Sequence, residues 1–263
     1  MTASFREGFV EADGFRIRYW EAGAGPVLVH LHGAGGPRLE RSHEMLAERH
    51  RVIVFEMPGF GASADNTRSG SMQELATIME RAIASLGVER CTLLGTSFGG
   101  KVSLWLAVLF PDRLDALILE GSGAIRPEGH HPPSGAPEEI ARRLYAHPER
   151  VPPVPPLDPA VAAKQRALTG RLRGPDRDAA LEERLPAMAV PTLVLFGTLD
   201  GVIPPEMGRE YKRLLPDCHL LFVYDAGHEI GAERPEAFVE AVSDFTARKA
   251  AFVINQVPTQ KFP

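Results

Sequence analysis

Short runs of mostly apolar residues recur along most of this chain, and longer segments with apolar residues at helical spacing follow them. The runs occupy residues 27–31, 52–55, 91–94, 114–119, 192–196 and 219–224. A short run that is apolar at nearly every position is typical of a strand that is covered on both faces, as in a parallel sheet. Because helical segments alternate with the runs, the sequence predicts an α/β fold with a mostly parallel, doubly wound sheet.

The N-terminal segment predicts strands of a different kind. Phe15, Ile17 and Tyr19 alternate with polar or amphipathic residues, directly after an Asp13-Gly14 pair. Strict alternation after such a pair indicates a hairpin with one buried face. Together with the apolar runs, the hairpin makes a predicted sheet of about eight strands.

The alternation stops at Ser122 and resumes near residue 188. Twelve of the chain's 23 prolines lie in this interval. Proline is favoured at the first position of a helix, and three helical stretches in the interval open with it: residues 137–145, 159–172 and 175–185. We therefore expect an inserted helical cap. The predicted division is a core of residues 1–121 and 188–249, a cap of residues 122–187 and a tail of residues 250–263.

Composition limits the classes of function. The 263 residues are 44% hydrophobic and 24% charged, as in a compact folded protein. The formal net charge is −5 and no basic block occurs, so nucleic acid is not an expected partner. No apolar run reaches the roughly 18 residues that a membrane span requires. With two cysteines and no secretory signal pattern, we expect a cytoplasmic protein that acts on a small molecule, as a monomer or homodimer.

Residues 93–100 contain the pattern Gly-x-Ser-x-Gly where a predicted strand meets a predicted helix. A sharp turn at this junction strains the backbone of the serine and leaves no room for side chains two residues away, hence Gly95 and Gly99. Ser97 would project its hydroxyl above the sheet, at the start of a helix whose amides favour an oxyanion. Ser97 is therefore the candidate nucleophile. For the pentapeptide alone, a capping serine in a glycine-rich turn is the alternative.

A glycine-rich loop, residues 32–36, directly follows the first apolar run. Its glycines would let the chain pass close to the nucleophile, so that the amides of Ala34 and Phe98 converge on a substrate carbonyl oxygen. We expect Gly35 to border the pocket. We expect His32 to hydrogen-bond the loop that it begins and not to act as the base.

Two further polar residues follow predicted strands. Asp200 lies in the loop after residues 192–196, and His228 lies in the loop after residues 219–224. The carboxyl ends of parallel strands meet at one edge of a sheet, and Ser97 also lies at that edge. The order Ser, Asp, His along the chain is one that a nucleophile, an orienting acid and a base can take.

These segments resemble the α/β-hydrolase superfamily over nearly the whole chain. The matching motifs are the loop at His32, residues 58–63, the elbow at Ser97, the loop at Asp200 and the Gly227-His228 pair. The resemblance looks closest to capped esterases and carbon–carbon bond hydrolases, whose cap is inserted after the sixth main strand. It implies an α/β-hydrolase fold without a cofactor, in which Ser97, Asp200 and His228 form the triad and Ala34 and Phe98 form the oxyanion hole. Haloalkane dehalogenases and epoxide hydrolases use aspartate at the elbow, so Ser97 argues against both.

Three positions depart from the carbon–carbon hydrolases. Those enzymes usually carry Asn before the nucleophile, Gly-Pro-Gly in the oxyanion loop and an aromatic residue after the histidine, where this chain has Thr96, Gly35-Gly36-Pro37 and Glu229. A serine esterase acting on a small to medium ester, thioester or lactone is therefore the first expectation. The alternatives are a carbon–carbon hydrolase of vinylogous diketones, another lyase or perhydrolase, and a non-catalytic binding protein. Glu120 occupies a position that supplies the acid in some relatives, so it remains an alternative to Asp200.

The predicted cap would lie over the nucleophile and select the substrate. Leu144, Leu168 and Leu172 are spaced to fall on the inner faces of its helices, and we expect them to line the pocket with Val202. The dense prolines predict that the cap moves in pieces about residues 122–123 and 187–189.

Several other polar residues have simpler interpretations. No cysteine or carboxylate cluster with ligand spacing accompanies His130, His131 and His147, so no metal site is expected. Glu56 is expected to bond loop amides as a structural acid.

Overall fold

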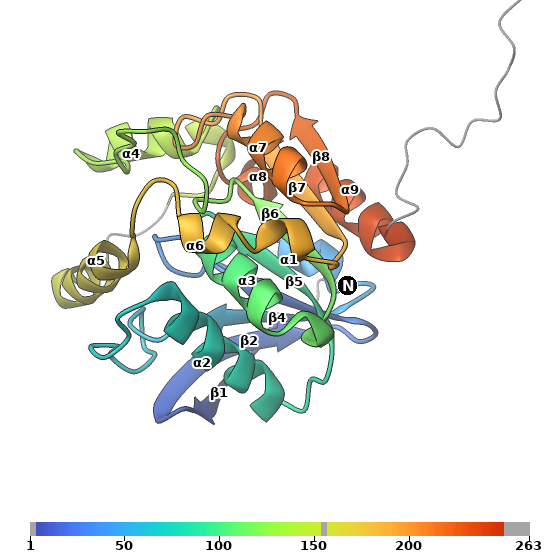
Figure 1. The fold of residues 1–263 in the computed structure, drawn as a ribbon. Helices are drawn as coiled ribbons and strands as arrows, with labels where there is room; N and C mark the ends of the chain where they lie inside the picture. Colours follow the sequence, from blue (N-terminus) through green and yellow to red (C-terminus); the bar gives the residue numbers. More distant parts are fainter. Residues whose placement is uncertain (1–3, 154–156, 250–263) are drawn as a thin grey trace, which may run out of the picture.

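We describe the protein from a computed structural model, which describes residues 4–153 and 157–249. Its centre is an eight-stranded sheet of order β1-β2-β4-β3-β5-β6-β7-β8 (Figure 1). The strands are β1 (Arg6–Ala12), β2 (Phe15–Ala22), β3 (Val27–Leu31), β4 (Arg51–Glu56), β5 (Cys91–Thr96), β6 (Leu114–Glu120), β7 (Thr192–Gly197) and β8 (Cys218–Val223). The hairpin β1–β2 is antiparallel and β2 joins β4 antiparallel, whereas the other neighbours are parallel. The predicted fold class is confirmed.

Two hydrophobic clusters explain why the central strands are apolar throughout. In β4, Ile53 and Phe55 face one cluster, while Val52 and Val54 face the other. The first cluster contains residues of α2 (Met72–Ser85), α3 (Phe98–Leu109) and α7 (Met207–Leu214). The second contains residues of α1 (Arg41–Leu46), α8 (Ile230–Glu233) and α9 (Pro235–Arg248). Because both faces are covered, neither side of a central strand can carry an unpartnered polar side chain.

The helices of the core follow their predicted periodicity, with one shorter than expected. The apolar stripe of α2, which includes Met72, Leu75 and Met79, is buried, and Ser71 caps this helix by accepting a hydrogen bond from the amide of Glu74. Residues 38–49 have apolar residues at near-helical spacing, which predicts a helix there, but α1 is only Arg41–Leu46. It begins late because His43 Nδ1 accepts the amide of Glu40, which places Glu40 at the cap position.

Residues 122–187 contain α4 (Pro137–Leu144), α5 (Pro159–Leu172) and α6 (Ala179–Glu182), with short 3₁₀ turns at Pro148–Arg150 and Leu185–Ala187. Figure 1 shows α4 and α5 on the same side of the molecule. The third expected helix was wrong in extent: Asp178 caps it by accepting the amide of Leu181, so it begins at Ala179 and not at Pro175. The predicted tail, residues 250–263, lies outside the described residues. No described helix is long and apolar enough to cross a membrane.

Gly197, at the end of β7, lies directly against the loop that follows β8, so a substitution there tests how closely the two segments pack. A Cβ on Gly197 would overlap the backbone carbonyl oxygens of Ala226 and Gly227. We expect Gly197→Ala to lower the free energy of unfolding by about 2 kcal/mol or more, because backbone cannot yield as a side chain can. Chemical denaturation measures this change.

Gly170 on α5 provides the matched control, since a Cβ there would meet nothing within 4 Å. Gly170→Ala should leave stability unchanged or raise it by about 0.5–1 kcal/mol, because alanine is the better helix former. Equal effects of the two substitutions would contradict the packing described for Gly197.

Candidate active site

The turn between β5 and α3 carries Ser97 in a strained conformation. Its φ is 52° and its ψ is −110°, in a region that side-chain-bearing residues rarely occupy. A Cβ on Gly95 would lie 2.7 Å from the carbonyl oxygen of Gly99, and a Cβ on Gly99 would overlap that of Leu31. The amide of Ser97 donates to the carbonyl of Glu120 at 2.9 Å, which holds the turn against β6. The glycines therefore have the steric role expected from the sequence.

The loop of residues 32–36 passes directly beside this turn. A Cβ on Gly33 would be 3.4 Å from Cβ of Ser97, and the amide of Gly36 closes the loop by donating to the carbonyl of Gly33 at 3.2 Å. Among the described residues, neither the amide of Ala34 nor that of Phe98 donates to another group. A Cβ on Gly35 would meet nothing within 4 Å, so the loop borders open space there. Two unused amides thus flank Ser97.

His32 holds this loop in place, as expected. Its Nδ1 donates to the carbonyl of Gly33 at 2.7 Å, and its Nε2 accepts the amide of Met57 at 3.1 Å. Burial lowers the pKa of His32 to about 4, although the bond to Gly33 opposes this shift. Both ring nitrogens are occupied, so His32 has no free nitrogen with which to accept a proton.

Asp200 and His228 form a direct, buried pair. Nδ1 of His228 donates to Oδ2 of Asp200 at 2.8 Å. The other oxygen of Asp200 accepts the amides of Val202 at 2.8 Å and Ile203 at 2.9 Å, which orient the carboxylate. With Nδ1 used as a donor, Nε2 of a neutral His228 is an acceptor, and it is buried without a hydrogen-bond partner in the described chain. This nitrogen is free to accept a proton.

Residues 121–123 lie between this pair and the elbow. A Cβ on Gly121 would be 2.8 Å from Nδ1 of His228, while the amide of Gly123 donates to the carbonyl of Ser97 at 2.9 Å. The structure therefore brings Ser97 and His228 to the same edge of the sheet on either side of one short segment. It places no hydrogen bond between the Ser97 hydroxyl and Nε2 of His228 within the described residues.

Glu120, the alternative acid, has different partners. Its Oε2 accepts the hydroxyl of Thr96 at 2.5 Å, and its Oε1 accepts the amide of Gly231 at 2.7 Å. The carboxylate that bonds the ring of His228 is that of Asp200.

Glu56 bonds loop amides, as its predicted structural role requires. Its Oε2 accepts the amides of Ala62 and Ser63 at 2.7 and 2.8 Å.

Comparison with known proteins now adds to this geometry. Residues 26–154 match a family model described as alpha/beta hydrolase fold, and residues 171–249 match one described as TAP-like protein. The chain belongs to the α/β-hydrolase superfamily. Its similarity to known hydrolases and esterases identifies it as a hydrolase.

Relatives of both kinds match over most of their length. The chain is 27% identical to the 2-hydroxy-6-oxo-6-(2'-aminophenyl)hexa-2,4-dienoic acid hydrolase of Metapseudomonas resinovorans, over 94% of this chain and 93% of that one. It is 28% identical to the pimeloyl-[acyl-carrier protein] methyl ester esterase of Vibrio campbellii, over 87% and 98%. A solved meta-cleavage product hydrolase from Pseudomonas fluorescens superposes with a TM-score of 0.78 at 18% identity, covering 91% and 97%, which supports the shared fold.

In this hydrolase, residues 144–147 of the insert lie across the loop that carries His228. The amide of His228 donates to the carbonyl of Leu144 at 2.7 Å, and the hydroxyl of Tyr145 donates to Oε2 of Glu229 at 2.7 Å. Arg38 donates to the same Glu229 oxygen at 2.7 Å and to Tyr145 at 2.6 Å. Sequence reasoning missed this cluster, because its members come from three distant segments and none stands in a recognisable local pattern.

Helix α5 packs over the loops beside the elbow. Leu168 is almost fully buried, and a Cβ on Gly59 would be 2.6 Å from its Cδ2. Leu172 is also buried, whereas Leu144 is only partly buried and contributes its carbonyl to the base loop. Gln165, which the sequence did not single out, reaches toward the loop of residues 32–36: a Cβ on Gly36 would be 3.2 Å from its Nε2. The insert thus contacts the loops beside both Ser97 and His228.

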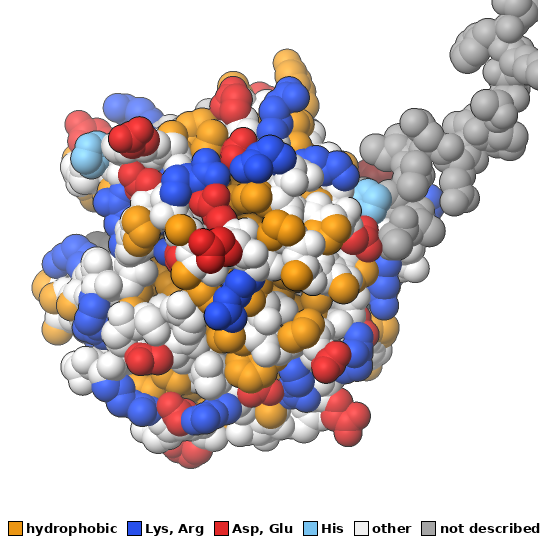
Figure 2. All heavy atoms as spheres, in the orientation of Figure 1, with side chains coloured by type: hydrophobic (Ala, Val, Ile, Leu, Met, Phe, Trp, Pro, Cys, Tyr) orange, Lys and Arg blue, Asp and Glu red, His pale blue; other side chains and the backbone are white. Residues whose placement is uncertain are grey.

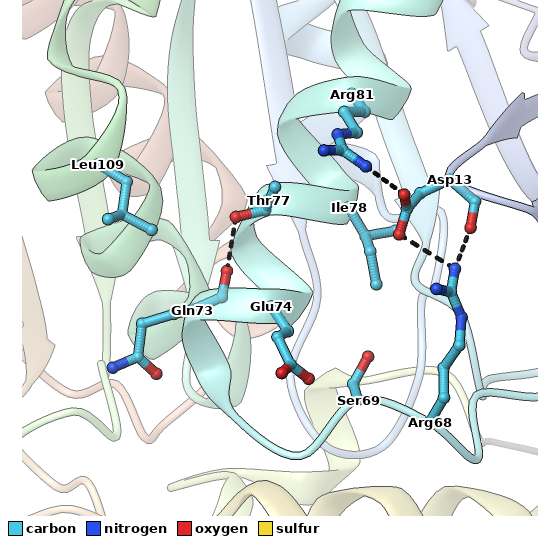
Figure 3. Close-up of a pocket in the computed structure, with 9 residues that line it drawn as sticks. All are labelled: Asp13, Arg68, Ser69, Gln73, Glu74, Thr77, Ile78, Arg81 and Leu109. Atoms are coloured by element: carbon cyan, nitrogen blue, oxygen red, sulfur yellow. Dashed lines mark hydrogen bonds and ion pairs between the residues drawn. The ribbon is translucent and has the colours of Figure 1, made fainter.

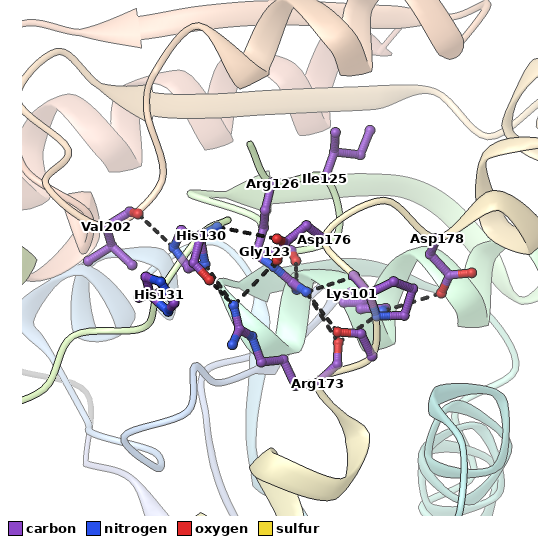
Figure 4. A network of polar contacts seen from close by, with 12 residues as sticks. Lys101, Gly123, Ile125, Arg126, His130, His131, Arg173, Asp176, Asp178 and Val202 are labelled. Atoms are coloured by element: carbon purple, nitrogen blue, oxygen red, sulfur yellow. Dashed lines mark hydrogen bonds and ion pairs between the residues drawn. The ribbon is translucent and has the colours of Figure 1, made fainter. Parts of the chain in front are cut away.

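A network of polar contacts joins the first residues of the insert to residues 173–176 and to α3 (Figure 4). The buried guanidinium of Arg126 donates to the carbonyls of Gly123 and Pro175, both at 2.7 Å. Lys101 on α3 donates to the carbonyl of Arg173 at 3.2 Å. The carbonyl of Ser122 accepts the buried hydroxyl of Tyr211. Residues 122–123, expected to act as a pivot, are therefore among the firmly bonded parts of the insert.

Two cavities differ in their relation to the site. One of about 420 Å³ borders Asp200 and Val202 and extends toward His130 and Arg143. The other, of about 530 Å³, lies between α2 and the β1–β2 turn, where Asp13 pairs with Arg68 and Arg81 (Figure 3). No member of the Ser97, Asp200 and His228 set lines the second cavity.

The protonation of His228 provides a test of the geometry that is independent of any substrate. Burial lowers its pKa, but the charge and hydrogen bond of Asp200, with help from Glu229 and Glu120, outweigh burial and raise the pKa above 6.5. In Asp200→Asn the ring loses its anionic partner, so we expect the His228 pKa to fall by about one unit or more. NMR titration of the imidazole measures it, with His228→Asn to assign the signal.

His32 is the internal control for that titration, since its low pKa does not depend on Asp200. Its signal should not move in Asp200→Asn. An unchanged His228 pKa in the variant would contradict the direct pairing of Asp200 with His228.

Proposed function

We propose that this protein is a serine esterase that cleaves a small to medium carboxylic ester through an acyl-enzyme, with Ser97 as nucleophile, His228 as base and Asp200 as orienting acid. One observation carries the proposal: His228 is bonded through Nδ1 to Asp200 while its buried Nε2 is unpartnered, at the sheet edge that also carries the strained Ser97. A strained elbow costs stability and has no use in a passive binding pocket.

The first half of the reaction forms the acyl-enzyme. Oγ of Ser97 attacks the ester carbonyl carbon while Nε2 of His228 takes its proton, and the charge of Asp200 stabilises the imidazolium. The amides of Ala34 and Phe98 stabilise the oxyanion, and donors in such positions are each worth about 2.7–4 kcal/mol. The imidazolium then gives its proton to the departing alcohol oxygen.

The second half releases the acid. Nε2 of His228 takes a proton from water, which attacks the acyl carbon, and the same two amides hold the second oxyanion. Collapse of that intermediate returns the proton to Ser97 and frees the carboxylic acid. The residues named supply every proton transfer, so this chemistry needs no cofactor.

Carbon–carbon bond hydrolysis is the second candidate, favoured by the relative from Metapseudomonas resinovorans that matches over nearly the whole chain. Two features near the triad favour the ester. Thr96 stands before the nucleophile with its hydroxyl committed to Glu120, and Glu229 follows the base in an ion pair with Arg38. The wall beside His228 is therefore charged where an aromatic ring would be expected for carbon–carbon cleavage.

Replacement of the nucleophile tests the assignment. Ser97→Ala should abolish nearly all hydrolysis of a p-nitrophenyl ester, and labelling by a fluorophosphonate probe, with no change in the circular dichroism spectrum. Ser85→Ala, at an exposed position on α2, is the matched control and should keep both activities. If Ser97→Ala retains a tenth of the wild-type rate, Ser97 is not the nucleophile.

A substrate panel separates the two reaction types. Short esters and vinylogous diketones are assayed side by side with the wild-type enzyme. Turnover of esters with little diketone cleavage supports the proposal, whereas cleavage of diketones alone, still dependent on Ser97, replaces it with carbon–carbon hydrolysis.

We propose that the insert acts as a cap that selects the acyl or alcohol chain. Substitution of Leu168 by Ala, and of Leu144 or Leu172 likewise, should change the ranking of esters by chain length by a factor of roughly 10 to 200. Kinetics on a series of p-nitrophenyl esters measures the ranking. Leu157→Ala, at a position of the insert that is 47% exposed, is the control. Probe labelling of Ser97 should survive in each variant, and an unaltered ranking would show that core loops alone form the pocket.

A further inference from the structure

The carboxylate of Glu120 is bonded to both segments that carry the proposed nucleophile and base. On one side it accepts the hydroxyl of Thr96, the residue before Ser97, and its own carbonyl accepts the amide of Ser97. On the other side it accepts the amide of Gly231, three residues after His228. Glu120 is almost fully buried, so water cannot replace these bonds. The proposed function makes no use of this side chain.

A line of buried hydrogen bonds leads across the sheet to this carboxylate. The amide of Glu40 donates to Nδ1 of His43 at 3.0 Å, so the proton of the neutral His43 ring is on Nε2. Nε2 of His43 then donates to Nδ1 of His30 at 2.8 Å, and Nε2 of His30 donates to the hydroxyl of Thr96 at 2.9 Å. Thr96 passes its only hydrogen to Glu120. One backbone amide therefore determines the direction of every bond in the line.

Both histidines of the line are neutral, as this direction requires. Burial lowers the pKa of His43 to about 4, and burial with the neighbouring His43 lowers that of His30 well below its ordinary value. The ionised carboxylate of Glu120 accepts from both of its partners, because Thr96 donates its hydrogen to one oxygen and the amide of Gly231 donates to the other. Ionised Glu120 and the neutral histidines thus form one self-consistent arrangement.

We propose that Glu120 is a positioning residue for the hydrolytic reaction, in which its ionised carboxylate, oriented by His43, His30 and Thr96, holds the elbow of Ser97 in register with the loop of His228. The proposal rests on the proposed serine hydrolase function. Catalysis by a nucleophile and a base on separate loops requires that their separation be held to a fraction of an ångström, and a misplacement of about 1 Å costs about a hundredfold in rate. Glu120 bonds both loops at once.

The charge of Glu120 also acts on His228, which gives the proposal a readout that a purely structural residue would not move. Glu120 raises the pKa of His228, together with Asp200 and Glu229. Burial and Glu229 raise the pKa of Glu120 itself to about 7, against the bonds from Thr96 and Gly231, and Glu40 at the start of α1 faces the same group of acids. Removal of the Glu120 charge should therefore lower the pKa of His228, and the pH midpoint of kcat/KM should fall with it.

The experiment measures kcat, KM and the pH midpoint of kcat/KM on a p-nitrophenyl ester for Glu120→Gln, Glu120→Asp and Thr96→Val. For Glu120→Gln we expect kcat to fall about tenfold, KM to stay within about twofold and the midpoint to fall by about half a unit. Glu120→Asp keeps the charge but is too short to bond both partners, so kcat should fall while the midpoint stays within about 0.2 units of the wild type. Thr96→Val, assayed at pH 9 where Glu120 is ionised, should lower kcat with little change in KM.

Glu56→Gln is the matched control, because Glu56 is also a buried carboxylate that accepts loop amides but bonds neither the elbow nor the base loop. It should lower the melting temperature without moving the midpoint. Wild-type kcat and midpoint in Glu120→Gln, with only a lower melting temperature, would overturn the proposal. So would a loss of about a thousandfold or more, which would make Glu120 the acid partner of the base. If Glu120→Gln does not fold, the other two variants carry the test.

Failure of the proposed function is distinguishable from failure of this inference. A wild-type enzyme that neither reacts with a fluorophosphonate at Ser97 nor turns over any ester rules out the serine esterase before a variant is compared. An active wild type with unaffected Glu120 and Thr96 variants rules out only the positioning role.

Discussion

Backbone crowding at the carboxyl edge of the sheet is the constraint on which the rest of the site depends. The loop after β3, the elbow after β5 and the segment after β6 approach so closely that a Cβ on Gly99 would overlap a carbonyl of the first and a Cβ on Gly100 would lie 3.0 Å from Cα of Ser122. Where these three segments meet, Ser97 has a positive φ of 52°. The strained backbone of Ser97 and the two unused amides beside Ser97 therefore both occur where the ends of parallel strands are crowded together.

The insert is bonded to this edge at several separate places, and one of them is the loop of His228, the proposed base. Because the amide of His228 donates to the carbonyl of Leu144, and Glu229 is shared between Arg38 and Tyr145, the insert cannot shift at residues 144–147 without disturbing the base loop. At its root, Arg126 and Tyr211 hold the chain near Ser97. Residues 122–123 are therefore a poor hinge, because motion there would break buried hydrogen bonds.

The parts of this structure that a local pattern determines were predictable from the sequence. Continuous apolar runs identified the buried strands, because both faces of the sheet are covered, and glycines two residues either side of Ser97 identified the turn, because only glycine fits there. The role of His32 followed from its place at the start of a loop. The line from His43 to Glu120 was not predictable, since its four side chains lie on α1, β3, β5 and β6 and meet only when the sheet forms. The extent of α6 was wrong for a similar reason: Pro175 is a valid helix start, but Arg126 holds residues 173–176 in another conformation.

The environment of His228 also explains how two buried acids near one histidine can have different roles. Asp200 touches the ring and has its second oxygen occupied by two amides, so its charge acts on His228 through a direct hydrogen bond. Glu120 acts on the ring only through space, and its oxygens are committed to Thr96 and Gly231. Burial alone would make the ring too weak a base near neutral pH, and the surrounding acids reverse that effect. The pKa of His228 is therefore a balance between burial, which lowers it, and the negative charges of the neighbouring acids, which raise it.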